Sequence, residues 1–310
     1  MSKTLLGMVT FGNLMFSRLT IESILNTTTK PLDLFVVVGK PGDTETIEWL
    51  ESKGIPHIIH PENYGFPWGL NDIYDRGWKE GSYDNIIIAG NDIIAYPNAI
   101  DSLIEVADTT KYEWISACQY DVKALLKDFP ECSDFFKGGT CQIDDAGLES
   151  KCWDKFKGYE GRSVQVSQPG LSDIHNLALY KRAVYEKVGY IDVNFYPAYY
   201  SDNDYARRGV NLGMADVAGT LLSAVYFHFW SRTIHQGENI VMDKHHAYFR
   251  NNAQFYNVKW GGGFGQESYN IPFGGKHFML APGITLDPTL NIQSRNNEES
   301  IVRFWRNLAT

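Results

Sequence analysis

The sequence predicts an α/β protein with a mixed, mainly parallel sheet that is flanked by helices. Short apolar runs alternate with stretches of helical periodicity through residues 1–107, which is the pattern of strand–helix–strand units. The composition supports a large buried core, because 44% of the residues are hydrophobic and only 21% are charged. Strand-to-helix units that follow one another in this way are typical of nucleotide-binding proteins.

The expected strands of the first half are short apolar runs that end at turn residues. They cover residues 4–9, 34–38, 56–59 and 85–89. The helices between them carry apolar residues at helical spacing and polar residues at their starts. We expect these helices at residues 17–28 with Ser17 as the cap, from the cap Asp43 through Glu51, at residues 66–80, and from Pro97, a residue that suits the first position of a helix, with an apolar face of Ile100, Leu103, Ile104 and Ala107.

The second half is less regular. Between residues 121 and 170, Gly, Lys, Asp and Cys alternate without a period, which predicts a loop-rich insertion. Regularity returns in a strand-to-helix pattern that Gly189 closes, and then in three further segments. These are a helical stretch at 204–212, an aromatic strand at 224–230 and a helix at 243–258, followed by a Gly-rich tail with a final helical pattern at 298–308.

Charge and composition exclude several classes of protein. The chain has 28 Lys and Arg against 37 Asp and Glu, and its net charge of -9 disfavours indiscriminate binding to nucleic acid. No stretch has the roughly 18–20 apolar residues that span a bilayer, and the N-terminus lacks the features of a signal peptide, so we expect a cytoplasmic protein. The four cysteines match no zinc pattern and are expected to be ordinary thiols: Cys118, Cys132, Cys141 and Cys152.

Candidate ligand-binding residues follow the predicted strands, because open α/β sheets bind ligands beyond the carboxyl ends of their strands. The segment ENYGFPWGLND leads into a predicted helix and contains Asn63, Gly65, Phe66, Gly69 and Asn71. Its glycines allow backbone amides to approach a phosphate or a sugar, and a helix N-terminus favours anions. The alternative is a tight connection between a strand and a helix, without a ligand.

Carboxylates at two further points are candidate site residues. Asp92 follows an apolar strand at the turn Gly90–Asn91–Asp92, beyond the carboxyl end of that strand. Asp202 and Asp204 lie at the start of a predicted helix. The alternative for each is a structural turn or helix cap.

A histidine completes the set of candidates. His228 lies in the aromatic segment SAVYFHFWSRT, about 24 residues after Asp204. Imidazole can complete the coordination shell of Mn²⁺, and less readily that of Mg²⁺. The alternative is a histidine packed in the core among aromatic side chains.

These segments, in this order, resemble the inverting, nucleotide-sugar-dependent glycosyltransferases of the GT-A fold, often called family 2. The resemblance covers roughly residues 3–262 and includes HHAYFRNNAQFYNVKWGG, which is similar to the closing helix of that family. It implies that Asp202 is the catalytic base and that Asp92 and His228 hold Mn²⁺ or Mg²⁺. It also implies that Asp204 holds Arg208 or a helix N-terminus.

The resemblance implies a donor site and a division of the chain. The turn with Asn63, Gly65, Phe66, Gly69 and Asn71 would lie beside the donor, together with Asn91. The usual acid after the second strand is missing, so we expect Asp43, or backbone groups near Thr10, Phe11 and Gly12, to hold the nucleotide base. Residues 1–262 would form the glycosyltransferase domain, with a nucleotide-sugar-binding half at 1–107, the insertion at 121–170, an acceptor and catalytic half at 171–262, and a C-terminal extension at 263–310.

The resemblance implies a function, and two alternatives stay open. We expect transfer of a sugar from a nucleotide diphosphate donor, with inversion, to a glycan or another hydroxyl acceptor. The chain has Gly90 and Ser201 where the family has acidic or Asn residues, which leaves open a degenerate protein that binds carbohydrate or nucleotide without turnover. The basic residues of the insertion leave open a hydroxylated DNA base as acceptor: Lys123, Lys127, Lys137, Lys151, Lys155, Lys157 and Arg162.

Overall fold

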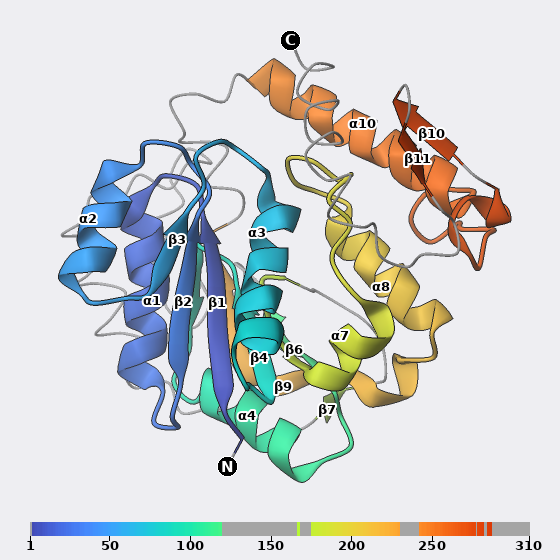
Figure 1. The fold of residues 1–310 in the computed structure, drawn as a ribbon. Coiled ribbons are helices and arrows are strands. Elements are labelled where there is room, and N and C mark those ends of the chain that lie inside the picture. Colours follow the sequence, from blue (N-terminus) through green and yellow to red (C-terminus); the bar gives the residue numbers. More distant parts are fainter. Residues whose placement is uncertain are drawn as a thin grey trace, which may run out of the picture.

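The computed structural model describes residues 2–119, 166–167, 175–229, 242–276, 278–281 and 284–286. Within them a nine-stranded sheet has the order β3-β2-β1-β4-β8-β6-β9-β5, and β7 also pairs with β9 (Figure 1). The strands of this sheet are β1 (Thr4–Thr10), β2 (Asp33–Val38), β3 (His57–Ile59), β4 (Asn85–Ala89), β5 (Ile93–Ala95), β6 (Trp114–Gln119), β7 (Val166–Ser167), β8 (Leu177–Lys181) and β9 (Ala218–His228). A separate hairpin is formed by β10 (Phe278–Ala281) and β11 (Ile284–Leu286).

The helices cover the sheet and one of them crosses the loop before α8. They are α1 (Leu14–Thr27), α2 (Thr44–Ser52), α3 (Phe66–Tyr74) with its π-helical continuation η1 (Asp75–Glu80), α4 (Ala99–Thr109), α7 (Arg182–Val188), α8 (Ser201–Asn211), η3 (Ala215–Val217), α10 (Met242–Trp260) and η4 (Pro272–Gly275). In Figure 1, α10 lies above the loop that leads into α8. None of the described helices is long and apolar enough to cross a membrane.

The strand directions confirm a mixed, mainly parallel sheet. Strands β1, β2, β3, β4, β6 and β9 run in one direction, and β5, β7 and β8 run against them. The parallel strands therefore end at the same edge at which β5 and β8 begin. We call this the carboxyl edge of the sheet.

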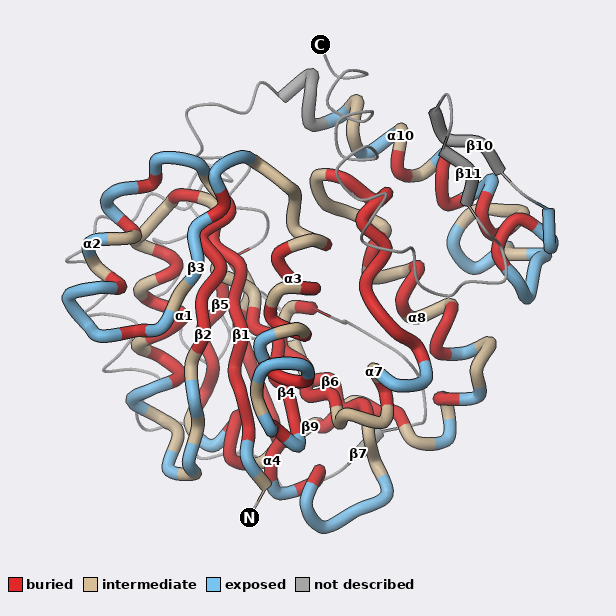
Figure 2. The backbone as a smooth tube through the Cα atoms, in the orientation of Figure 1, coloured by how far each residue is buried: buried red, intermediate tan, exposed pale blue. Residues whose placement is uncertain are grey.

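The core lies on both faces of the sheet, because successive residues of a strand point to opposite sides. Leu5 and Ile86 pack on one face with Ile73 of α3 and Val184 of α7. Leu6, Ile87 and Ala89 pack on the other face with residues of α1 and α4. Figure 2 shows the central strands buried along their length between these two layers.

Most of the predicted elements are confirmed, with shifts at their ends. The side chain of Asp43 caps α2 by accepting from the Thr46 amide (3.4 Å). Gly189 closes α7 with φ 84°, and the predicted helix at 66–80 is formed by α3 and η1 together. The apolar face of Ile100, Leu103, Ile104 and Ala107 in α4 is buried.

Two predicted helix starts are wrong, and in both cases an asparagine explains the difference. Helix α1 begins at Leu14 after Asn13 (φ 63°), so Ser17 is a buried residue of its first turns and no cap. Helix α4 begins at Ala99 after Asn98 (φ 65°), which leaves Pro97 outside it. Asparagine tolerates the left-handed conformation better than most residues, and that conformation starts both helices.

Strand β9 begins at Ala218, before the predicted start at 224, because residues 218–221 already pair with β6. Of the predicted insertion at 121–170, only β7 is described, and the final helical pattern at 298–308 lies outside the described residues. The basic residues predicted in the insertion also lie outside the described residues. Cys118 lies in β6, and the other three cysteines lie outside the described residues.

Candidate active site

The strand order brings several predicted site residues to the carboxyl edge. Thr10, Phe11 and Gly12 follow β1, and Asn91 and Asp92 lie between β4 and β5. His228 ends β9, which runs parallel to β6 and so ends at the same edge. Residues that are far apart in the sequence are therefore collected at the part of the sheet where α/β proteins bind ligands.

Asp92 and His228 are in direct contact. Asp92 Oδ1 lies 3.0 Å from His228 Nε2, and both side chains are largely buried. The pairing of β5 with β9 sets this contact, because Ile93 is opposite His228 and the Phe229 amide donates to the Asp92 carbonyl (2.9 Å). The hydroxyl of Thr20 in α1 fixes the start of β5 by bonding both the amide and the carbonyl of Ile93.

The spacing of this pair fits a shared divalent cation. Two ligands that bind an octahedral cation at about 2.1 Å and at right angles lie about 3.0 Å apart. A carboxylate and an imidazole suit Mn²⁺ in particular. Among the described residues no third His, Cys, Asp or Glu joins the pair, so the other positions of a bound cation would be left to donor oxygens or water.

Asp43 connects two loops of the carboxyl edge. Its Oδ2 accepts from the Gly12 amide (3.2 Å) and its Oδ1 accepts from the Thr46 amide at the start of α2. The side chain is largely buried. Asp43 therefore holds the loop after β1 against α2. Phe11, in the same loop, is half-buried.

The turn before α3 is locked against the segment that leads to α8. Asn63 Oδ1 accepts from the Gly65 amide (2.9 Å), and Gly65 has φ 87°. The Phe66 amide donates to the Pro197 carbonyl (2.7 Å), so this first amide of α3 is used within the protein. A Cβ at Gly65 would lie 2.8 Å from the ring of Tyr196, which requires glycine at this position.

Two residues predicted to bind the donor belong instead to the scaffold. A Cβ at Gly69 would lie 2.8 Å from Val9, so the glycine is required for close packing of α3 on β1. Asn71 is fully buried, and its amide group donates to the Ile191 carbonyl (2.9 Å) and accepts from the Ile191 amide (2.8 Å). The prediction of donor contacts at these two positions is corrected, because both residues are buried and make these contacts within the protein.

Asp202 and Asp204 take different roles on α8. Asp202 is partly exposed in the first turn and accepts from the Asn203 amide (2.8 Å). Asp204 is fully buried and its Oδ2 lies 3.0 Å from Arg208 Nε. The prediction that Asp204 holds Arg208 is confirmed.

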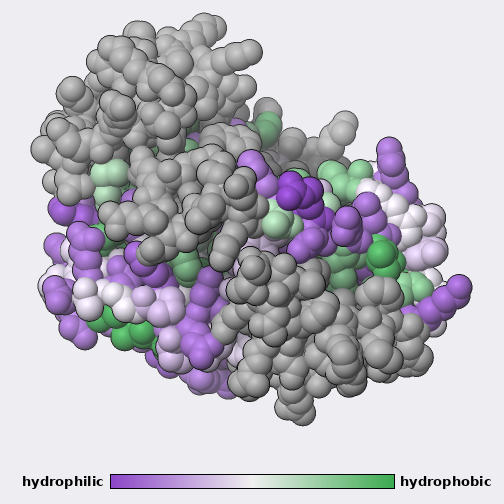
Figure 3. Space-filling model, turned by 90° about the horizontal axis from the view of Figure 1, so that it is seen from above, coloured by the Kyte–Doolittle hydropathy of each residue, from purple (hydrophilic) through white to green (hydrophobic). Residues whose placement is uncertain are grey.

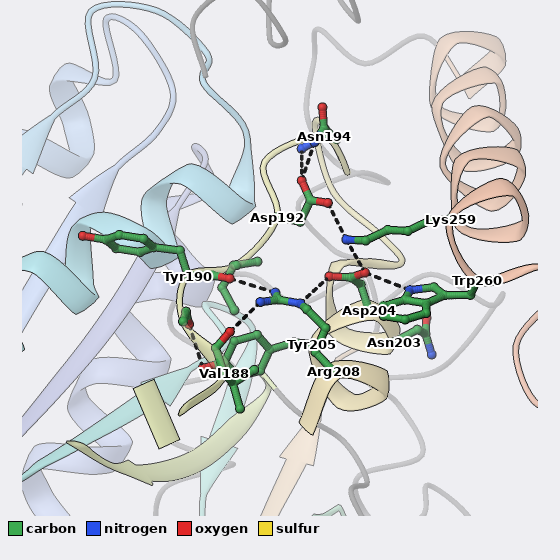
Figure 4. Close-up of polar contacts among 12 residues, drawn as sticks. Val188, Tyr190, Asp192, Asn194, Asn203, Asp204, Tyr205, Arg208, Lys259 and Trp260 are labelled. Atoms are coloured by element: carbon green, nitrogen blue, oxygen red, sulfur yellow. Dashed lines mark hydrogen bonds and ion pairs between the residues drawn. The ribbon is translucent and has the colours of Figure 1, made fainter. Parts of the chain in front are cut away.

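A buried network of charges surrounds Asp204. Only its pair with Arg208 was predicted from the sequence. Lys259 of α10 reaches between Asp192 and Asp204, at 2.6 Å from each (Figure 4). Trp260 Nε1 donates to Asp204 (2.9 Å). Arg208 also donates to the carbonyls of Val188 and Tyr190, both at 2.8 Å. The network ties α8, α10 and the segment between α7 and α8 together.

The charges of this network balance. Burial alone would raise the pKa of Asp204, but the neighbouring cations Lys259 and Arg208 outweigh it and hold that pKa below its usual value. Two carboxylates thus face two cations in a buried site. In the sequence, Lys259 lies two residues before Gly261, and no local pattern connects it with Asp204.

Two histidines near the carboxyl edge, His60 and His175, were not predicted from the sequence as residues of the site. His60 Nε2 lies 2.7 Å from Asp72 Oδ2 in a buried pair. His175 lies just before β8 with φ 89°, and its ring packs near Phe66 and Tyr205. Among the described residues, neither ring nitrogen of His175 has a hydrogen-bond partner.

His175 predicts a loss of stability in mild acid. Burial, with a smaller effect of the Arg208 charge, lowers the pKa of His175 from 6.5 to about 3. The unfolded chain therefore takes up this proton below about pH 6.5 while the folded chain stays neutral. We expect His175 to contribute a fall of about 2 kcal/mol in the free energy of unfolding between pH 7 and pH 5.

Urea denaturation at the two pH values measures this effect. His175→Asn should flatten the pH dependence, because asparagine tolerates the left-handed backbone and does not titrate. The half-buried His57 offers the control, and His57→Asn should keep the wild-type slope. Equal slopes for wild type and His175→Asn would contradict the prediction.

Solved structures with a similar fold include glucosyl-3-phosphoglycerate synthase from Mycobacterium tuberculosis. The two chains align with a TM-score of 0.50 and 14% identity over 93% of this chain and 90% of the synthase. The fold is that of the GT-A glycosyltransferases. One structure of the synthase, with the same similarity, is a complex with Mn²⁺, UDP-glucose and phosphoglyceric acid.

The other comparisons are weaker. A GT-A-type mannosyltransferase from Pyrobaculum calidifontis, solved with GDP-Man and Mn²⁺, aligns with 13% identity over 71% of this chain and 57% of its own, with a TM-score of 0.43. No protein-family model matches the sequence, and no curated protein matches it significantly.

Proposed function

We propose that this protein is a glycosyltransferase that moves a sugar from a nucleotide diphosphate donor to an acceptor hydroxyl, with inversion and with the help of a divalent cation. The observation that carries the proposal is the contact of Asp92 with His228 (3.0 Å) at the carboxyl edge of a GT-A sheet. The same fold in a synthase solved with Mn²⁺ and UDP-glucose supports it.

Asp92 and His228 would hold the cation, which is Mn²⁺ or Mg²⁺. When bound, it offsets the negative charge that grows on the diphosphate as the bond to the sugar breaks. The donor would lie along the loops of the carboxyl edge, near Thr10, Phe11, Gly12 and Asp43, with Asn63 and Asn91 at its border. The half-buried ring of Phe11 is suited to a nucleotide base.

Asp202 would act as the base. It would accept the proton of the acceptor hydroxyl as the hydroxyl oxygen attacks the anomeric carbon and the bond to the diphosphate breaks. Partial exposure suits this role, because the carboxylate can meet a substrate. Asp204 is unsuited to it, since it is fully buried and ion-paired with Arg208 and Lys259.

Thermal unfolding with nucleotides tests the donor site. We expect one nucleoside diphosphate or nucleotide sugar, together with MnCl₂, to raise the Tm by about 2–4 °C when present at about 100 times its Kd. Asp92→Asn should remove the part of the shift that needs the metal. Asp216→Asn, an exposed carboxylate in η3, is the matched control and should keep it.

The same panel distinguishes turnover from binding. Slow hydrolysis of the stabilising nucleotide sugar, detected as release of nucleoside diphosphate, is expected of a transferase. A metal-dependent shift without any hydrolysis or transfer would favour the degenerate binding protein. A panel without any shift would contradict the proposed donor site.

A further inference from the structure

Three aromatic side chains meet at the segment that leads into α8, the helix that carries the proposed base. Tyr199 and Tyr200 directly precede α8, whose second residue is Asp202. The ring of Phe249 in α10 lies 5.5 Å from the ring of Tyr199 and 5.3 Å from that of Tyr200, centroid to centroid. We call Tyr199, Tyr200 and Phe249 the aromatic cluster.

An uncommon backbone conformation brings the two tyrosines to one phenylalanine. Tyr199 has φ 73° and Tyr200 has φ 63°, a left-handed conformation that bulky residues rarely adopt. In an extended segment, neighbouring side chains point to opposite sides, so they could not both meet the same ring. Strained conformations of this kind persist where the surrounding structure holds them, and they occur often at binding sites.

Helix α10 holds this conformation. Asn252 is fully buried, and its side-chain amide donates to the carbonyls of Ala198 (2.6 Å) and Tyr199 (3.3 Å). Tyr256 packs against Tyr200 at 5.6 Å. Phe249, Asn252 and Tyr256 are three and four residues apart, so one face of α10 contacts the whole segment before α8.

The aromatic cluster is partly exposed to solvent, although contacts with α10 fix its backbone conformation. Phe249 is 42% exposed, and Tyr199 and Tyr200 are partly exposed. Seen from above in Figure 3, hydrophobic and hydrophilic side chains are mixed on the described surface. Aromatic faces beside a carboxylate suit a ligand that has both an apolar face and hydroxyl groups.

The charges near the cluster favour a neutral ligand. Lys259 and Arg208 are paired with buried carboxylates. Arg207 donates to the Tyr269 carbonyl at 2.8 Å. Asp202, two residues after Tyr200 in the chain, adds a negative charge to this segment, and this charge would repel an anionic acceptor. Arg250, which follows Phe249 in α10, is an exposed cation that could bind an anionic acceptor. The test of the cluster therefore includes an anionic ligand for comparison.

We propose that the aromatic cluster is an acceptor subsite that binds the apolar face of a neutral sugar ring and presents one of its hydroxyls to Asp202. The role of the bound sugar as an acceptor rests on the proposed function. Binding of a sugar to the cluster is independent of that function and can be measured without turnover.

Saturation-transfer NMR and titration on the full chain, with UDP and MnCl₂ present, test the subsite. The probes are the methyl glycosides of glucose, galactose and N-acetylglucosamine, with 3-phosphoglycerate as the anionic counter-probe. We expect at least one glycoside to bind, and Phe249→Ala to weaken its affinity about three- to tenfold, since an aromatic contact is lost. Phe264→Ala removes an aromatic ring that is 67% exposed elsewhere, and it should keep the wild-type affinity.

The possible outcomes separate this proposal from the proposed function. The subsite is overturned if no glycoside binds, if only 3-phosphoglycerate binds, or if Phe249→Ala stays within about twofold of wild type. If no nucleotide of the panel gives a thermal shift with Mn²⁺ but Phe249→Ala weakens glycoside binding, the subsite is supported and the transferase is not. Weaker binding in Phe249→Ala together with a nucleotide shift supports both.

Discussion

Asp202→Asn is expected to lower the rate of sugar transfer by about 100- to 10,000-fold, because a positioned base contributes roughly that much to a reaction. Asparagine keeps the shape of the side chain and can still accept from the Asn203 amide, so the start of α8 should be unchanged. It cannot take the proton of the acceptor hydroxyl. The loss should therefore fall on kcat, and the affinity for the donor should stay close to that of wild type.

Two measurements on the same samples check this expectation. Transfer is followed by release of nucleoside diphosphate, and donor affinity by the nucleotide-induced rise in Tm. Asn203→Ala, at the neighbouring position of α8, is the control and should retain most of the activity. Near-normal turnover by Asp202→Asn would show that another group is the base.

Lys259→Met is expected to lower the free energy of unfolding by about 3–5 kcal/mol, because it leaves buried carboxylates without their cation. Lys259 is almost fully buried and lies 2.6 Å from both Asp192 and Asp204. Methionine has a similar length and an apolar side chain, so the loss of charge is the main change. Chemical denaturation at pH 7 measures the effect.

A second substitution tests whether charge, and not packing, explains this loss. Adding Asp192→Asn to Lys259→Met removes one of the two carboxylates and restores the balance with Arg208. The Asn194 amide can still donate to the new side chain. We expect the double variant to regain about 1–3 kcal/mol over Lys259→Met.

A surface ion pair provides the control for the network. Arg76 pairs with Glu80 in the same exposed helical turn, at 3.3 Å. Arg76→Met should cost less than about 1 kcal/mol, because exposed pairs contribute little. If Lys259→Met costs no more than Arg76→Met, the buried network does not stabilise the fold in the way that its geometry indicates.

The sequence predicted local features well where a local cause exists. The apolar run of β4 was predicted with its bounds, and Asp43 was predicted as a cap because its side chain serves an amide three residues away. The pairing of Asp204 with Arg208 is also local, since residues four apart share one side of a helix. Ser17 and Pro97 failed as helix starts, because asparagines in the left-handed conformation took that role.

Features that depend on distant contacts were missed. Asn71 was predicted to line a ligand site, but its amide is used by the backbone of Ile191, 120 residues away in the chain. The partners of Asp204 in α10 are 55 and 56 residues away. No period or motif connects such residues, because only the packing of α8 against α10 sets their distance.

Periodicity, capping and side-chain chemistry act over a few residues, so the class of the fold and most of its strands and helices could be predicted from the sequence. The resemblance also paired Asp92 with His228, whose contact the structure contains. The scaffold role of Asn71, the position of Lys259 between Asp192 and Asp204, and the meeting of Tyr199 and Tyr200 with Phe249 emerge only in the folded chain. Such contacts depend on the order and direction of strands and on the packing of helices, where each position is set by the whole chain.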